Sequence, residues 1–102
     1  MTHFARIVLV GELTESPRTI GQTQDKKPIV RFLVKVEKPS KTDYYPTTAW
    51  RGLAEACLEN LRKGDTVKVE GDARTSAYDK DGTKCRGIEI SADDVIFLNY
   101  KE

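Results

Sequence analysis

Residues 50–75 read WRGLAEACLENLRKGDTVKVEGDART, and the spacing of their apolar side chains changes midway. From Thr66 to Tyr78, apolar and polar residues alternate, which is typical of a β-strand. The preceding half has the spacing of a helix about ten residues long. We expect Arg62 and Lys63 in the last turn of this helix and Gly64 as its left-handed cap. Its apolar stripe consists of Leu53, Ala54, Cys57, Leu58 and Leu61.

Alternation with a period of two continues outward from this stretch in both directions. Polar residues 21–28 interrupt it and predict a loop. Thr19 and Ile20, just before that loop, form at most a short continuation of the first strand. The elements expected around the helix are strands at 6–13, 29–36, 44–50, 66–78 and 84–90, a hairpin turn at 79–82, a turn at 91–94 and a closing segment at 95–98.

The parity of each strand predicts which side chains point into the core. The inward rows comprise Ile7, Leu9, Val30, Phe32, Val34, Val36, Tyr45 and Phe97. The outward rows comprise Val8, Val10, Arg31, Leu33, Lys35, Tyr44, Thr48 and Trp50. Because the first strand is apolar on both faces, we expect it to lie at the interface of a symmetric oligomer.

Five strands with one helix between the third and the fourth is the element order of an OB-fold. The fold class expected is therefore all-β with one helix, arranged as a five-stranded Greek-key barrel. The alternative is an open sandwich with one additional helix. A chain of 102 residues makes a single domain, here spanning 1–102.

Composition excludes several classes of function. The net charge of +1 does not indicate a nucleic-acid partner, so any charged site must arise from local sorting of charge. His3 is the only histidine, and no metal-ligand cluster, phosphate loop or catalytic motif is present, so we expect no cofactor, no metal and no enzymatic activity. Cys57 and Cys85 are expected to be reduced thiols. Without a signal or membrane segment, the expected location is the cytoplasm.

The stretch at 50–75 also carries a family resemblance. It combines an aromatic residue, a Leu-Ala-Glu helix, Leu-Arg-Lys-Gly, and a Val-x-Val-x-Gly strand ending in Arg74-Thr75, and so resembles the bacterial single-stranded DNA-binding proteins. The first strand, Phe32 and the closing segment extend the resemblance over about residues 5–98. It implies a homotetramer, associated with the nucleoid, that binds single-stranded DNA without strong sequence preference.

The resemblance implies two sets of binding residues. Trp50, Tyr44 and Tyr78 match positions that commonly hold base-stacking aromatics, although each could instead be a core side chain. Arg6, Lys63 and Arg74 match positions that are often basic. Further cations expected to contact phosphates, unless they are simply solvated, are Arg31, Lys35, Lys84 and Arg86 in the strands, with Lys38, Lys41 and Lys80 in or beside the loops.

The chain departs from the family pattern at its end. It stops at Glu102 where typical members continue into a long tail with an acidic tip, so we expect no tail-mediated recruitment of partners. A tail-less OB dimer of the primosomal PriB type, which bridges helicase components, is therefore an alternative function. A third is an enzyme, or an unrelated OB module that binds oligosaccharide or structured RNA.

Overall fold

A computed structural model describes the backbone of residues 5–98, and within that range it describes all side chains except those of 76–80 and 84–86. The elements in chain order are β1 (Arg6–Leu13), β2 (Arg18–Gln22), β3 (Pro28–Glu37), β4 (Thr42–Trp50), α1 (Arg51–Asn60), β5 (Thr66–Lys80) and β6 (Thr83–Phe97). Among the described residues, no helix has the length and apolar character needed to cross a bilayer.

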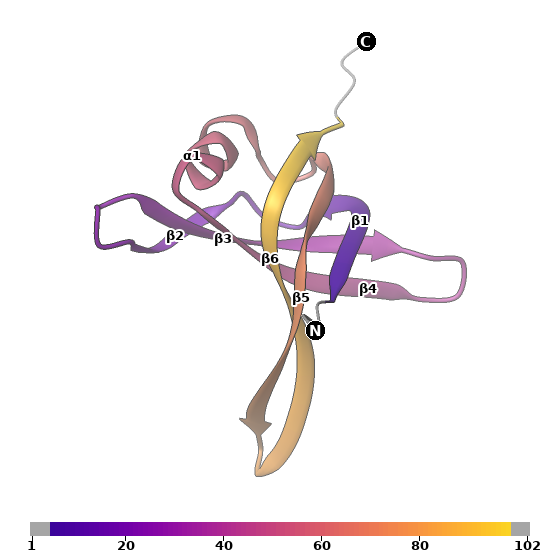
Figure 1. The fold of residues 1–102 in the computed structure, drawn as a ribbon. Helices are drawn as coiled ribbons and strands as arrows, with labels where there is room; N and C mark the ends of the chain where they lie inside the picture. Colours follow the sequence, from indigo (N-terminus) through magenta and orange to yellow (C-terminus); the bar gives the residue numbers. More distant parts are fainter. Residues whose placement is uncertain (1–4, 99–102) are drawn as a thin grey trace.

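The strands form one sheet with the order β1-β5-β6-β4-β3-β2, and an additional β1–β3 pairing closes five of them into a ring. Strands β4 and β6 pair in parallel, unlike their neighbours in the sheet. The helix α1 lies between β4 and β5 in the chain and packs on β3, β4 and β6. Figure 1 shows the hairpins β2–β3, β3–β4 and β5–β6 extending from this ring in three directions. The ring confirms the OB-fold, and the open sandwich is wrong.

The ring closes where β1 passes from one neighbour to the other. β1 pairs with β5 from Arg6 to Glu12 and with β3 only through Glu12 and Leu13. At the crossing, a Cβ atom on Gly11 would lie 2.3 Å from the carbonyl oxygen of Lys35. Only glycine therefore allows β1 and β3 to approach this closely.

The core follows the predicted parity. The inward side chains of β1, β3 and β4 meet the buried Ala54 and Cys57 of α1 and the buried Leu61 that follows the helix. One expectation is wrong: Phe97 is 40% exposed, because β6 presents it near its end instead of burying it. The fully buried side chains of the described residues include Leu13, Val30, Val34, Thr47, Val67, Val69 and Ile90.

The helix ends earlier than its sequence predicts. Its last residue is Asn60, and Leu61 is already extended, with its N–H donating to the carbonyl oxygen of Cys57. Gly64 does have a positive φ of 92°, but it belongs to the following turn, where its N–H donates to the carbonyl oxygen of Leu13. Arg62 also lies outside the last turn, yet its Nη1 donates to the carbonyl oxygens of Leu58 and Leu61. The predicted glycine cap is therefore wrong, and an arginine side chain satisfies carbonyls at the helix end.

The turn predicted at 91–94 is also wrong, because β6 runs without interruption from Thr83 to Phe97. Its ladder with β5 pairs Glu70 with Asp94 and Gly71 with Ala92, so Asp93 is an extra residue in a β-bulge. A Cβ atom on Gly71 would lie 2.1 Å from the carbonyl oxygen of Ser91, so the bulge needs glycine opposite it.

The segment around Ile20 is a separate strand, not a continuation of β1. β2 pairs with β3 from Arg18 to Gln22, with a register shift between Thr19 and Gly21. The expected loop shortens to a turn in which the N–H of Thr23 donates to the carbonyl oxygen of Lys27. This hairpin adds β2 to the outside of the five-stranded ring.

Cys57 provides a test of the core that is independent of function. Burial raises the pKa of its thiol to about 11. At about pH 8 only about one thiol in a thousand is then ionised, and the thiolate is the reactive form. We expect iodoacetamide to alkylate the Cys57 peptide far more slowly in the folded protein than in urea, as measured by peptide mass mapping. Equal rates in the two states would place Cys57 outside the core.

Candidate nucleic-acid interface

The outer face of the β3–β4 hairpin carries alternating cationic, apolar and aromatic side chains. Lys35 lies directly across from Tyr44, Leu33 across from Pro46, and Arg31 across from Thr48. Tyr44 is 55% exposed, whereas its neighbour Tyr45 packs against the core. The predicted parity is confirmed here, and it leaves the Tyr44 side chain exposed.

Trp50 lies at the other end of the same row and lines a hollow of about 80 Å³. The hollow spans three strands, because β4 pairs with β6 at Thr48 and Ser91, and β6 pairs with β5 at Glu89 and Arg74. Its walls thus combine a half-buried aromatic ring with a cation. The full lining is Thr48, Trp50, Arg74, Glu89, Ile90 and Ser91.

Glu89 sets the electrostatics of this hollow. Nη2 of Arg31 donates to its Oε1 at 3.2 Å, and both side chains are partly exposed. Arg74 lies across the β5–β6 ladder from Glu89 and forms no ion pair with another described side chain. Glu89 of this hollow is therefore already paired with Arg31, and Arg74 is the cation among the residues that line the hollow.

A second hollow, of about 390 Å³, lies beside Tyr44 near the end of the β3–β4 hairpin and is also lined by Lys38, Lys41 and Ile88. Asp43 binds both lysines, with its carboxylate oxygens 2.6 Å from Nζ of Lys38 and 4.0 Å from Nζ of Lys41. The hydrogen bond from Lys38 lowers the pKa of the Asp43 carboxyl below its ordinary value. These lysines are thus partly neutralised.

Lys35, across from Tyr44, is also engaged. Its Nζ lies 3.2 Å from Oε1 of Glu37, and this hydrogen bond raises the pKa of the Lys35 ammonium. Because both charges lie at the surface, the pair is weak, and an incoming phosphate can compete for the lysine.

Two predicted phosphate contacts lie apart from the aromatic row. Arg6 extends from β1 to the bulge and binds both Asp93 and Asp72, the latter at 3.0 Å. The hydrogen bonds to Asp93 and then Asp72 raise the pKa of its guanidinium. Lys63 lies in the turn after α1, where its backbone N–H donates to Oγ of Ser16 at 3.1 Å. The structure does not bring either residue together with Trp50 or Tyr44.

Three further predicted site residues lie near the end of the β5–β6 hairpin, the part that extends from the ring and is called the β5–β6 arm below. In its backbone ladder Tyr78 pairs with Cys85, Asp79 with Lys84, and Ala77 with Arg86. The side chains of Tyr78, Lys84 and Arg86, like that of Lys80, lie outside the described residues. Their roles therefore remain predictions from the sequence.

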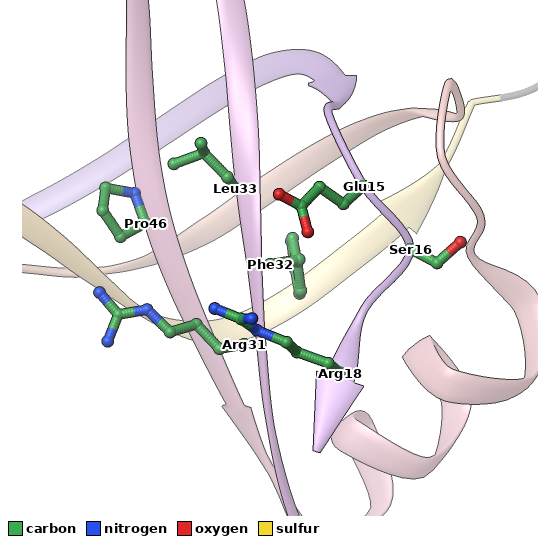
Figure 2. Close-up of a pocket in the computed structure, with 7 residues that line it drawn as sticks. All are labelled: Glu15, Ser16, Arg18, Arg31, Phe32, Leu33 and Pro46. Carbon is green, nitrogen blue, oxygen red and sulfur yellow. The ribbon is translucent and has the colours of Figure 1, made fainter. Parts of the chain in front are cut away.

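Arg18 is not among the cations predicted from the sequence. This residue is exposed on β2 and lines a hollow of about 170 Å³ together with Arg31, Leu33 and Pro46 (Figure 2). Its only signal in the sequence is its place after Pro17 and just before the short strand continuation expected at Thr19 and Ile20. The hairpin pairing of β2 with β3 is what brings it to the outer face.

Comparison with known proteins shows the family of this chain. The model of the Single-strand binding protein family matches residues 4–98. The single-stranded DNA-binding protein of Caldanaerobacter subterraneus subsp. tengcongensis is 37% identical, over 94% of this chain and 69% of that protein.

Two further relatives are more distant. The single-stranded DNA-binding protein 2 of Chlorobaculum tepidum is 28% identical over 100% of this chain and 76% of its own length. The single-stranded DNA-binding protein of Clostridium tetani is 28% identical over 93% and 70%. Since the family model spans all of the described residues, and since one relative is 37% identical over most of both chains, the chain belongs to the single-strand binding protein family.

Proposed function

We propose that this chain binds single-stranded DNA in DNA metabolism, by base stacking on Trp50 and Tyr44 and by phosphate contacts from nearby cations. The observation that carries the proposal is that both aromatic side chains lie in one outward row of β4, flanked by Lys35, Arg31 and Arg74. The names of the relatives support it. The function is one of binding, with no catalytic step.

Stacking explains why such a site accepts any base sequence. Every base offers a π-face to an aromatic ring, and one stacked base contributes about 1–3 kcal/mol. In a duplex the bases are already stacked and paired, so they cannot lie on Tyr44 or Trp50 without strand separation. We therefore propose that the site discriminates single strands from duplexes and reads little sequence.

We keep the remaining predicted contacts within the proposal. Tyr78, Lys84 and Arg86 lie on the β5–β6 arm, which extends away from the ring and can contact a strand leaving the Trp50 hollow (Figure 1). Arg6 and Lys63 contact phosphates only after the strand has passed beyond the aromatic row. For Arg6, a phosphate must also compete with Asp72 and Asp93.

The direct test is a titration with oligothymidine of about 16 nucleotides, a length within the range that one OB domain covers. Trp50 is the only tryptophan, so stacking on it is expected to quench the intrinsic fluorescence. An unlabelled duplex of the same length is expected to compete poorly. If the duplex competes as well as the single strand, the proposed function is wrong, and the primosomal alternative gains support.

We propose that the protein acts as a homo-oligomer, most simply a tetramer, assembled through β1. Val8 and Val10 are 56% and 51% exposed on its outer face, and Ile96 of β6 lies nearby at 42%. Among the described residues, the edge of β1 opposite β5 has no strand partner over residues 6–11. An open apolar edge of this kind favours pairing with a second copy. Together with a DNA ligand, this assembly fits a protein of the bacterial cytoplasm, at the nucleoid.

Charges on this face are expected to break the assembly. The double variant Val8→Lys and Val10→Lys should have a smaller mass by light scattering than the parent, because burying lysine at an interface is unfavourable. The matched control is Ile20→Lys, which adds a charge at an apolar residue that is 51% exposed on β2. It should leave the mass unchanged. A parent that is monomeric at micromolar concentration would refute the assembly.

A further inference from the structure

Two arginines lie directly opposite each other in the β2–β3 hairpin. Arg18 of β2 is the register partner of Arg31 of β3. Like charges in this cross-strand arrangement are destabilising unless something compensates them. Arg31 has Glu89 as its partner, whereas Arg18 forms no ion pair with another described side chain. The pair therefore leaves positive charge uncompensated at this edge of the sheet.

The arginine pair lines the hollow of about 170 Å³ seen in Figure 2. Both side chains extend in the same direction there, with Leu33 and Pro46 beside them. The remaining lining is Glu15, Ser16 and the edge of Phe32. The hollow thus has two guanidinium groups, an apolar floor and a single carboxylate, a combination that suits one phosphate followed by an apolar sugar or base face.

One row of paired residues connects the hollow at Arg18 and Arg31 with the hollow at Trp50. Arg31 lies between Arg18 on β2 and Thr48 on β4, and Thr48 already lines the Trp50 hollow. From Thr48 the row continues to Ser91 on β6 and Asp72 on β5, and Arg74 lies two residues farther along β5. With neighbouring strands about 4.8 Å apart, the path along the sheet from β2 to β5 is about 19 Å long. A single strand that stacks on Trp50 can cross this distance within one domain.

We infer that Arg18 and Arg31 together hold a backbone phosphate where the bound strand leaves the sheet at β2, with the adjoining nucleoside against Leu33 and Pro46. This inference rests on the proposed function and extends the contact surface from Arg31, which already belongs to it, to Arg18 on β2. The phosphate is the anion that relieves the repulsion between the two arginines. Glu15, which lines the same hollow, disfavours a second phosphate there, so the site holds one.

The test compares the salt dependence of binding for the parent and for Arg18→Ala. Each phosphate contact contributes about 0.7 to the slope of log K against log salt for a single strand. Arg18→Ala is expected to flatten the slope by about that amount for each protomer engaged, and to weaken binding about threefold to tenfold at low salt. Arg18→Lys, which keeps the charge but lacks the planar fork, should recover most of the slope.

The matched control is Lys26→Asn. It removes one positive charge from the turn of the same hairpin, at a residue with φ of 61° where asparagine is tolerated. Its slope should equal that of the parent. A second readout uses oligothymidine in which methylphosphonates replace the phosphates. Arg18→Ala and the parent should bind this neutral backbone equally well, because the arginine acts on the charge of the phosphate.

The outcomes separate the two claims. If the parent binds single strands tightly and Arg18→Ala has the same affinity and slope, the phosphate site is wrong and the proposed function stands. The phosphate site is also wrong, and the proposed function stands, if Lys26→Asn flattens the slope as much as Arg18→Ala does. The slope would then depend on the total charge of the protein and not on the position of Arg18. If the parent binds no single-stranded DNA, both claims fail. Thermal unfolding of Arg18→Ala should occur at the temperature of the parent or slightly above it, since the replaced side chain is exposed and its repulsion with Arg31 is removed.

Discussion

Replacing Gly11 with alanine is expected to lower the free energy of unfolding by about 3 kcal/mol. The added Cβ would lie 2.3 Å from the carbonyl oxygen of Lys35 and 2.8 Å from Cγ1 of Val34. Neither atom can move freely, because one belongs to the backbone of β3 and the other to a fully buried side chain. The strands must therefore separate at the place where β1 and β3 pair.

The matched control is Gly52→Ala in α1, where a new Cβ would meet no atom within 4 Å. Alanine has the higher helix propensity, so this variant should gain about 0.5–1 kcal/mol. Denaturant unfolding at constant protein concentration measures both changes. If Gly11→Ala proves as stable as the parent, the close crossing that completes the ring is wrong.

Replacing Trp50 with alanine is expected to weaken single-strand binding by about 1–3 kcal/mol for each base that stacks on it. This corresponds to about a 5-fold to 150-fold loss of affinity. The slope of log K against log salt should stay nearly unchanged, because stacking releases no counterion. Trp50 thus contrasts with Arg18 and Arg74, whose replacement should flatten that slope.

The matched control is Trp50→Phe, which keeps an aromatic face and should retain much of the affinity. Since both variants lack the only tryptophan, binding must be followed by the anisotropy of a labelled oligonucleotide. Thermal unfolding checks that each variant is folded. Unchanged affinity of Trp50→Ala would mean that Trp50 only supports the core beside Ile90, and the stacking site would have to lie elsewhere.

Much of the fold could be predicted because period-two alternation sets the direction of a side chain from its own position. The buried Val30 and Val34, the exposed Tyr44, and the helix between the third and fourth ring strands all follow from local pattern. The bulge could not be predicted in this way. Ser91 to Asp94 have the composition of a turn, and only the β5 ladder on both sides of Asp93 keeps the chain extended.

Local pattern also could not predict where the helix ends or which acidic residues pair with the arginines. Leu61 is extended because the turn after it pairs with β1, where the N–H of Leu13 donates to the carbonyl oxygen of Asp65. The partners of Arg6 lie 66 and 87 positions away, and Glu89, the partner of Arg31, lies 58 positions away. No local pattern reports such contacts. Sequence parity thus predicted that Tyr44 faces outward and Tyr45 inward, but not which cations are already neutralised.

The closure of the ring also constrains the order in which the chain can fold. β1 is made first, yet its ladder joins Arg6 to Asp72, a residue 66 positions later. Contacts between such distant residues form slowly, because a long loop must close before they contribute any stability. During synthesis the apolar β1 strand therefore stays unpaired until β5 has been made, while the β2–β3 and β3–β4 hairpins can form locally. The nascent chain is most prone to aggregation during this interval. In refolding experiments we expect a slow step whose rate depends on the pairing of β1.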